Sequence, residues 1–343
     1  MGGRAVPYGV LPEENVSYFS EKSGRDKENV IVKIKLNYFF LALILLGAFW
    51  GGVTTYAQSP TIAERLGYPP DAKLLIIHAD DLAVAHSVDM ASFRELEAHN
   101  VSSASVMVPC PWLPEVVDYA RKHPETDFGL HLTLNSEWTP YRWGPQSPRD
   151  QVKSLLDPDG YLWSDSPLTV QHGQPEDVER EIRAQIEQAL RMGLHPTHVD
   201  SHQATIEERK DFFAAMVKVA HEFHLPFRCS RPELERNGWL SLVSPQDVIL
   251  DRFLEPNYHV PPDQWVDSYL RMLDRVVPGL NQMIVHLGYD DAELQAITIV
   301  NPGWDAKWRQ RDLDLVGNPV FKEALRSRHI IVIGWRELDK FVP

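Results

Sequence analysis

The chain has 343 residues, 43% of them hydrophobic, which is enough for one large core or two modest ones. Acidic residues outnumber basic ones by 48 to 34, and the formal net charge is -14. This charge argues against a nucleic acid or an anionic membrane surface as the main partner, because both are polyanions.

The N-terminal segment has the pattern of an export signal. Lys33 and Lys35 precede an apolar stretch at 38–53, and small or polar residues follow it. The apolar stretch is shorter than the roughly 20 residues of a membrane-spanning helix, and the triplet 55–57 resembles a signal-peptidase site. We therefore expect residues 1–57 to be an N-terminal extension with a signal peptide, and the protein to be exported to the periplasm or beyond the cell.

One alternative for this segment stays open, namely that it is retained as an N-terminal membrane anchor. Residues 1–30 are polar and long for the region that precedes a signal sequence. We expect the true start to lie near Val30 or Val32, which N-terminal sequencing of the precursor would test.

Two cysteines, Cys110 and Cys229, have no spacing typical of a metal or redox motif. In an exported protein they are compatible with one disulfide, and equally with two free buried thiols. No functional role is assigned to them.

From Leu74 onward, short apolar runs alternate with helical patterns, as expected for a parallel sheet covered on both faces. The strand candidates are 74–79, 103–108, 128–134, 197–201, 226–229, 282–287 and 329–334, with a weaker one at 247–253. Helical patterns lie at 87–100, 175–193 and 318–329. In the second of these, Val178, Ile182 and Ile186 recur every four residues and Gly193 is a natural stop.

Seven or eight βα units in about 270 residues predict an α/β fold, a (β/α) barrel with a parallel central sheet, regular or irregular. We expect 58–343 to form a single (β/α)-barrel catalytic domain. A doubly wound open sheet is the alternative, but no glycine-rich phosphate turn follows a predicted strand. The stretch around 135–174 has little periodicity and is expected to be a loop insertion at the edge where barrel enzymes build their sites.

Polar residues gather at the ends of four predicted strands. They are Asp80, Asp81, His131, His198, Asp200, His202 and His286. In a parallel barrel these ends meet on one rim. Each residue alone has an ordinary explanation, since an aspartate at a strand end often caps a helix and a lone histidine is more often a hydrogen-bonded core residue. Together they favour a metal site.

One carboxylate and two imidazoles suit a divalent ion and leave positions open for water, the arrangement of a hydrolytic site. Of two adjacent aspartates, one can then bind the ion while the other takes a proton from water. Side-chain alternation puts His198 on the same face as Asp200 and His202, so His198 is a ligand or a partner that orients one. We expect Asp200 either to contact the substrate or to orient a ligand imidazole.

The segments "LLIIHADDLA", "SSASVMV", "DFGLHLTL" and "PTHVDSHQ", in this order, resemble the YdjC/ChbG family of carbohydrate deacetylases, which includes chitooligosaccharide deacetylases. The resemblance covers about 73–339. It implies a (β/α) barrel, and it implies Asp81, His131 and His202 as metal ligands, with Asp80 as the catalytic base.

The same resemblance places His286 at the family's His-Pro-Gly segment, as the candidate general acid. It places Arg228 where the family has an arginine near the site, to orient Asp80 or to bind substrate. The chain also departs from the family. It has Leu82-Ala83 for Phe-Gly, Leu287 for a proline, and Ala204-Thr205-Ile206 for His-Val-His, which leaves the identity of the substrate open.

The expected activity is a metal-dependent hydrolase that removes acetyl groups from N- or O-acetylated carbohydrates. The expected cofactor is one divalent ion, Zn or Mg in first place, with Mn, Co and Ni also compatible. The expected partner is an acetylated oligosaccharide or amino sugar, with no nucleic acid and no membrane beyond the targeting segment, and a homodimer is compatible with the sequence. Trp143 and Trp163, with Tyr141 and Tyr161, are candidates for stacking on sugar rings.

Two other classes stay open. One is a metal-dependent hydrolase of another glycan bond or of a phosphoester, although no basic phosphate cradle is evident. The other is a secreted carbohydrate-binding protein without catalysis, against which the presence of Asp80 argues. Acetate release would separate these classes.

Overall fold

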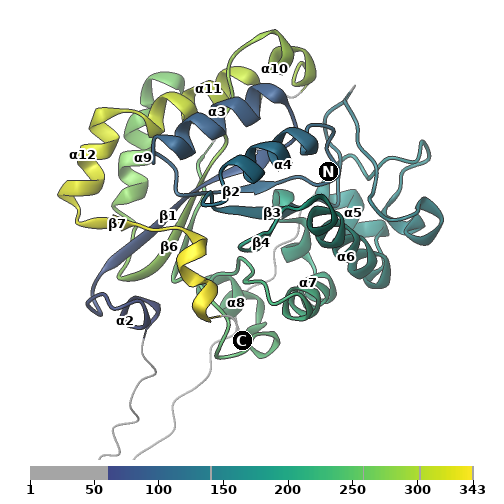
Figure 1. Cartoon of the computed structure of the whole chain (residues 1–343), viewed down its shortest axis with the longest axis horizontal. Coiled ribbons are helices and arrows are strands. Elements are labelled where there is room, and N and C mark those ends of the chain that lie inside the picture. Colours follow the sequence, from purple (N-terminus) through teal and green to yellow (C-terminus); the bar gives the residue numbers. More distant parts are fainter. Residues whose placement is uncertain (1–60, 140, 258, 301–302, 342–343) are drawn as a thin grey trace, which may run out of the picture. The chain divides into compact units, whose positions relative to one another are not determined.

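The computed structural model describes residues 61–139, 141–257, 259–300 and 303–341, and Figure 1 shows their course. The predicted export segment at 1–57 lies outside these residues, so export and the alternative of a membrane anchor stay predictions. Among the described helices, none is long and apolar enough to cross a membrane.

Within the described residues, seven strands form one sheet in which every pair is parallel. The strands are β1 (Lys73–Leu82), β2 (Ser103–Val106), β3 (Phe128–Leu132), β4 (Val199–Ser201), β5 (Arg252–Leu254), β6 (Gly279–Val285) and β7 (Ile330–Val332). Their order is β4-β3-β2-β1-β6-β5, and β7 pairs with the first half of β1. The carboxyl ends of the six ordered strands therefore point to one edge of the sheet.

Single-residue bridges continue the pairing from β4 to β5. Val199 pairs in parallel with Phe227, and Ser230 pairs in parallel with Leu250, two residues before β5 begins. The predicted strand at 226–229 is thus reduced to isolated bridges, but it still joins the two ends of the sheet. The prediction of a (β/α) barrel with irregular geometry is confirmed.

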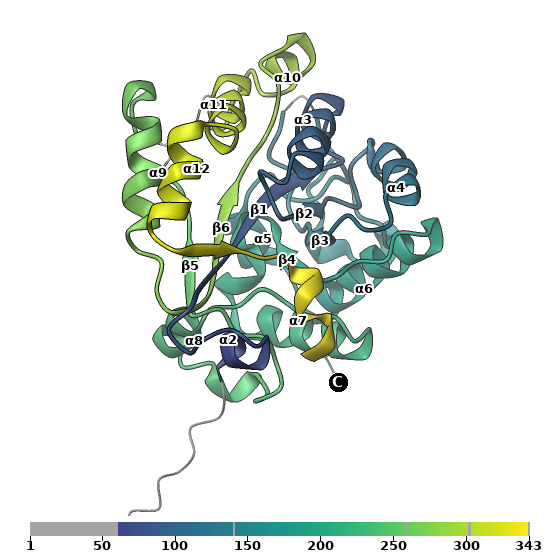
Figure 2. The same cartoon turned by 60° about the vertical axis from the view of Figure 1, so that its left-hand side comes forward.

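Helices surround the sheet, as Figures 1 and 2 show. They are α2 (Ile62–Arg65), α3 (His86–Glu97), α4 (Leu113–Lys122), α5 (Ser166–His172), α6 (Pro175–Met192), α7 (Lys210–Glu222), α8 (Arg231–Asn237), α9 (Trp265–Leu273), α10 (Ala292–Ile297), α11 (Ala306–Val316) and α12 (Pro319–Ser327). Short 3-10 helices lie at Arg149–Gln151, Lys153–Leu155, His202–Glu208, Leu240–Leu242, Pro262–Gln264 and Trp335–Phe341.

Helix α6 follows its sequence pattern. Val178, Ile182 and Ile186 are fully buried, and the helix ends at Gly193, whose φ of 89° is the left-handed conformation of a C-terminal cap. Leu190, one further step of four residues along the same stripe, is 37% exposed.

Side-chain alternation along β1 divides the core into two apolar clusters. Leu75 and Ile77 belong to the larger cluster with the surrounding helices, whereas Leu74 and Ile76 belong to a smaller one on the other face of the strand, which includes Trp335. The same alternation places His78 and Asp80 on the face of Leu74 and Ile76, one and two layers nearer the carboxyl end. The two cysteines, Cys110 and Cys229, are buried free thiols.

Candidate active site

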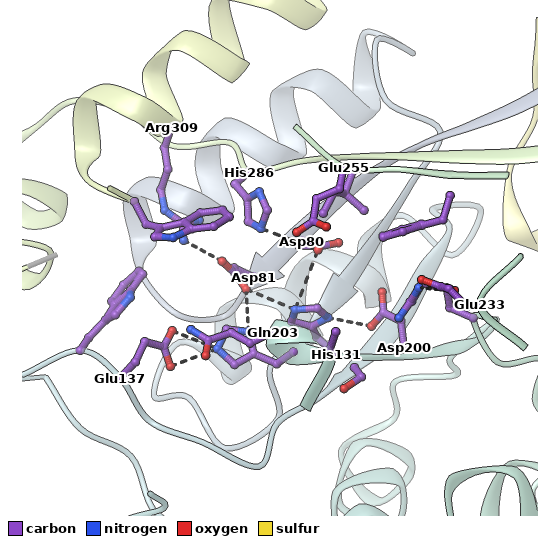
Figure 3. A pocket seen from close by; sticks show the side chains of 18 residues that line it. Asp80, Asp81, His131, Glu137, Asp200, Gln203, Glu233, Glu255, His286 and Arg309 are labelled. Atoms are coloured by element: carbon purple, nitrogen blue, oxygen red, sulfur yellow. Dashed lines mark hydrogen bonds and ion pairs between the residues drawn. The ribbon is translucent and has the colours of Figure 1, made fainter. Parts of the chain in front are cut away.

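At the carboxyl end of β1, the side chains of Asp80 and Asp81 both point toward one cavity (Figure 3). Neighbouring residues of a regular strand point to opposite faces. Asp81 has a φ of 72° and Ala83 a φ of 73°, so the backbone leaves the regular strand at this point. Left-handed backbone is costly for residues other than glycine, although aspartate tolerates it better than most. This turn is fixed by the buried carboxylate of Asp89, which accepts the main-chain N–H of Ala83 at 2.6 Å.

Asp81 lies between two imidazoles, one from β3 and one from the 3-10 helix that directly follows β4. Its Oδ1 atom is 3.4 Å from His131 Nε2 and 3.3 Å from His202 Nδ1, and all three side chains are buried. Ligand atoms around a tetrahedral divalent ion lie about 3.4 Å apart, given bonds of about 2.1 Å. Oδ1 is buried and lacks a hydrogen bond of ordinary geometry within the described residues. The three predicted ligands therefore fit one divalent ion.

Each imidazole is oriented by a carboxylate on its other nitrogen. His131 Nδ1 lies 2.7 Å from Asp200 Oδ1, and His202 Nε2 lies 3.0 Å from Glu137 Oε1. Metal-binding histidines commonly have such partners, which fix the ring and its tautomer. Asp200 was a predicted partner of this kind. Glu137 was not predicted, because it lies in the irregular stretch after β3.

The same carboxylates set the charge of the imidazoles. Burial lowers the pKa of His202, but the Glu137 and Asp81 carboxylates raise it by more than burial lowers it. The resulting pKa of His202 is about 9. Burial also opposes ionisation of His131, yet Asp200 and Asp80 hold the pKa of His131 well above its usual range. Without an ion, both rings therefore carry a proton at neutral pH.

Arg309 of α11 fixes the second oxygen of Asp81. Its Nη2 donates to Asp81 Oδ2 at 2.6 Å, and both side chains are buried. This contact keeps the pKa of the Asp81 carboxyl well below its usual range despite burial. Because Oδ2 is occupied, Oδ1 is the atom that faces the two imidazoles. Arg309 was not predicted, since it lies 228 residues from Asp81 in the sequence, in a helix with many charged residues.

The second aspartate, Asp80, stands beside this triad. Its Oδ2 is 4.0 Å from His131 Nε2 and 3.7 Å from His286 Nε2, and its Oδ1 is 3.4 Å from His78 Nε2. Burial raises the pKa of Asp80 to about 6, the nearby His131 and His78 offsetting part of the effect. Burial lowers the pKa of His286 to about 3. At neutral pH Asp80 is thus a carboxylate and His286 a neutral imidazole.

Comparison with known proteins shows the family of this chain. The family model for YdjC-like proteins matches residues 74–327. The chain belongs to the YdjC-like family. The residues that carried the resemblance, including Asp80, Asp81, His131 and His202, lie within the matched range.

Relatives of this YdjC-like chain are named as deacetylases. It is 30% identical to a carbohydrate deacetylase of Thermus thermophilus over 80% of this chain and 97% of the relative. It is 23% identical to a chitooligosaccharide deacetylase of Yersinia enterocolitica over 74% of this chain and 95% of the relative. A crystal structure from Enterococcus faecalis V583, described as a candidate cellobiose-phosphate cleavage protein, has a TM-score of 0.66 and 26% identity, covering 78% and 99% of the two chains. These comparisons agree with the barrel fold.

The triad opens into a cavity of about 390 Å³. This volume is within the range of small-molecule sites. Its lining comprises Asp80, Asp81, His131, Glu137, Trp138, Asp200, Ser201, His202, Gln203, Ala204, Arg228, Glu233, Phe253, Glu255, Ile284, His286, Trp304 and Arg309. Most of the predicted site residues of this YdjC-like chain therefore meet in one cavity.

Five predicted residues do not line it, namely His198, Trp143, Trp163, Tyr141 and Tyr161. His198 is fully buried and stacks on Trp335 at 4.7 Å between ring centroids, one layer below Asp200. Trp143 donates its indole N–H to Asn135 O and packs behind His202, with 6.5 Å between the ring centroids. Neither has a surface on the cavity, so a role in direct substrate contact is not supported.

Trp163 lies away from the cavity as well. Its indole N–H donates to Ser154 O, and its ring stacks on His172 at 4.4 Å. Both of these partners lie within the segment 135–174. The tryptophans that do line the cavity are Trp138 and Trp304.

Arg228 lines the cavity but pairs with glutamates rather than with Asp80. Its Nη2 contacts Glu207 Oε1, and its Nη1 lies 3.5 Å from Glu233 Oε2. Its guanidinium also covers the ring of Phe253, 4.4 Å from the centroid. Of the two roles implied for Arg228, a place in the substrate-binding wall is the one that this geometry allows.

Proposed function

We propose that this YdjC-like protein is a metal-dependent carbohydrate deacetylase that hydrolyses the acetamide of an N-acetylated sugar. The observation that carries the proposal is the convergence of Asp81, His131 and His202, with Asp80 held beside them as a separate carboxylate. The names of the carbohydrate and chitooligosaccharide deacetylases to which the chain is similar support the substrate class.

Asp81, His131 and His202 would hold one divalent ion, which supplies a Lewis acid for the acetyl carbonyl and lowers the pKa of a bound water. Arg309 keeps the Asp81 carboxylate in one orientation, and Asp200 and Glu137 keep the two rings in the orientation that this requires. The donor set favours Zn over Mg, because two of its three atoms are imidazole nitrogens.

Asp80 acts as the general base in this proposal. With a pKa of about 6 it is ionised at neutral pH, yet its affinity for a proton is higher than that of an ordinary aspartate. It therefore takes the proton of the attacking water as the new C–O bond forms. This role needs a carboxylate that is not itself a ligand, and the longer distances of Asp80 Oδ2 from His131 and His286 support that assignment.

His286 delivers a proton to the leaving amine. The sequence suggested a protonated imidazole, but a pKa of about 3 makes this ring neutral before the reaction. Its Nε2 lies 3.7 Å from Asp80 Oδ2, so Asp80 is the nearby source from which His286 gains the proton that it passes on. The C–N bond then breaks with the amine leaving as a neutral group.

Acetate release from metal-restored protein tests the proposal. The metal-stripped protein would be reloaded separately with Zn, Mg, Mn, Co or Ni and offered N- and O-acetylated sugars. We expect Asp80→Asn to bind metal normally and to lose at least about a hundredfold in kcat, the usual scale of a general base. His131→Ala should lose both metal binding and turnover, and Asp71→Asn, at an exposed aspartate outside the cavity, should lose neither. Full activity of Asp80→Asn would refute the base assignment.

A further inference from the structure

A second histidine of β1, His78, lies directly beneath Asp80 inside the barrel. It precedes Asp80 by two residues on the same strand, so the two side chains share one face in successive layers. His78 is fully buried, and a buried imidazole needs partners for its polar nitrogens within the protein. No step of the proposed reaction uses this ring.

The two nitrogens of His78 have different partners. Nδ1 lies 2.5 Å from the hydroxyl oxygen of Ser103, which is paired with His78 in the register of β1 and β2. Nε2 lies 3.1 Å from Asp200 Oδ2 and 3.4 Å from Asp80 Oδ1. A hydroxyl can donate or accept a hydrogen bond, whereas an ionised carboxylate can only accept. The proton that this arrangement requires is therefore the one on Nε2, and the Ser103 hydroxyl suits either state of Nδ1.

One N–H thus serves two buried carboxylates. Neither contact of Nε2 has the geometry of an ordinary hydrogen bond, as expected for a donor placed between two acceptors. The contact at Asp80 Oδ1 matters most, because this oxygen is buried and has no hydrogen bond of ordinary geometry within the described residues. Without the ring, Asp80 Oδ1 would lose the donor nearest to it and would face the like charge of Asp200.

The contact with His78 also fixes which oxygen of Asp80 faces the reaction. With Oδ1 directed to His78, Oδ2 is the oxygen near His286 and His131, at 3.7 Å and 4.0 Å from their Nε2 atoms (Figure 3). Arg309 has the corresponding effect on the other aspartate, since it binds Asp81 Oδ2 and leaves Oδ1 to the imidazoles.

His78 further connects Asp80 to the metal site. Asp200 contacts His78 through Oδ2 and the ligand ring of His131 through Oδ1, the latter at 2.7 Å. One buried chain of contacts therefore runs from the proposed base to a proposed ligand, and His78 is its central member.

We infer that His78 is a positioning residue, which holds the Asp80 carboxylate so that Oδ2 takes the proton of the attacking water, and that Ser103 fixes the His78 ring for this task. The inference rests on the proposed function for the reaction, whereas the orientation of the Asp80 carboxylate can be observed without it. A histidine that only filled the core would contribute to stability and leave the turnover of the folded protein unchanged.

The kinetic test replaces His78 in the full chain and measures acetate release at saturating Zn²⁺. His78→Phe keeps a planar ring but removes the N–H, and we expect kcat to fall at least about tenfold while KM changes less than about threefold. His78→Gln has an amide that can place a donor near the position of Nε2, and it should recover at least about a third of the wild-type kcat.

The matched control changes a buried polar residue that does not reach Asp80. Gln282 of β6 is fully buried, is paired with Ile76 one layer below His78, and accepts the indole N–H of Trp335 at 3.0 Å. Gln282→Leu should lower the melting temperature, as His78→Phe should, but it should keep kcat within about twofold. An unchanged kcat in His78→Phe would overturn the inference, and so would a His78→Gln variant no more active than His78→Phe.

Crystal structures of the variants give a readout that does not depend on turnover. We expect the Asp80 carboxylate to turn away from its wild-type orientation in His78→Phe and to keep it in His78→Gln; an unchanged orientation in His78→Phe would refute the inference. If the wild-type protein releases no acetate, the proposed reaction fails and these structures alone decide the role of His78. If His78→Phe does not fold, Ser103→Ala decides it, since this variant keeps the ring without its Nδ1 partner and should lower kcat at least about threefold. An unchanged kcat in Ser103→Ala would then count against the inference.

Discussion

Metal binding to this site should release protons. In the metal-free protein the pKa of His202 is about 9, and that of His131 is held well above its usual range, so both rings are protonated at pH 7. An ion can bind an imidazole nitrogen only when that nitrogen has no proton. We therefore expect Zn²⁺ binding at pH 7 to displace about two protons per chain.

The pH dependence of metal affinity follows from the raised pKa values of the two imidazoles. Freeing His202 at pH 7 costs about 3 kcal/mol, because a pKa of about 9 lies about two units above that pH and each unit is worth 1.36 kcal/mol. The protonated forms persist below the raised pKa, so acid weakens metal binding. With two protons displaced, the apparent affinity should rise about a hundredfold from pH 6 to pH 7, and the contribution of His202 to this rise should end as the pH passes about 9.

Isothermal titration calorimetry in two buffers of different ionisation enthalpy measures the number of protons released. Glu137→Gln should reduce the release toward one proton, since Glu137 is the foremost of the groups that raise the pKa of His202. Glu235→Gln, outside the site, should leave it at two. A release well below one proton in the wild-type protein would show that the imidazoles are neutral before the ion arrives, and would refute the reasoning.

Two further predictions concern stability. Ala83 is fully buried with a φ of 73°. Ala83→Gly should therefore change the free energy of unfolding by less than about 1 kcal/mol, whereas Ala83→Val should lower it by at least about 2 kcal/mol. Equal melting temperatures of the two variants would contradict this prediction. Arg309→Leu removes the cation that is hydrogen-bonded to Oδ2 of the buried Asp81 carboxylate and should cost the metal-free protein about 3 kcal/mol, with part of the loss recovered when Zn²⁺ is added. Arg328→Leu, which breaks a pair with the exposed Asp274, should cost less than about 1 kcal/mol, and similar losses in the two arginine variants would refute the role of Arg309.

The sheet could be predicted because its strands are buried on both faces and read as apolar runs. The strand prediction failed where the pairing of a segment depends on residues far away in the sequence. The run at 226–229 forms one bridge, at Phe227, and Ser230 directly after it forms another, but there is no continuous strand, which the sequence of the run does not reveal. Helix α5 was missed for another reason. Its signal is local, an Asp165 cap followed by Ser-Pro, but the surrounding aromatic and glycine residues of 135–174 hid it.

The metal ligands could be predicted from strand ends, since parallel strands deliver those ends to one edge. The groups that orient them could not. Glu137 comes from an irregular segment and Arg309 from a helix, and their partners depend on packing that no spacing in the sequence encodes. The tryptophans that line the cavity could not be predicted either, because the sequence shows where a tryptophan occurs but not the direction in which its side chain points.

His198 shows what side-chain alternation along a strand can and cannot predict. It does share a face with Asp200, as the period of two requires, but on the inner side of a barrel residues two apart lie in successive layers. His198 therefore belongs to the layer below, where it meets His78 at 5.0 Å between ring centroids and stacks on Trp335. Alternation predicts the face of a residue, whereas its depth depends on where the strand ends. Strand β4 ends at Ser201, and the left-handed backbone of Gln203 and Ala204 that follows it is not marked by a glycine in the sequence.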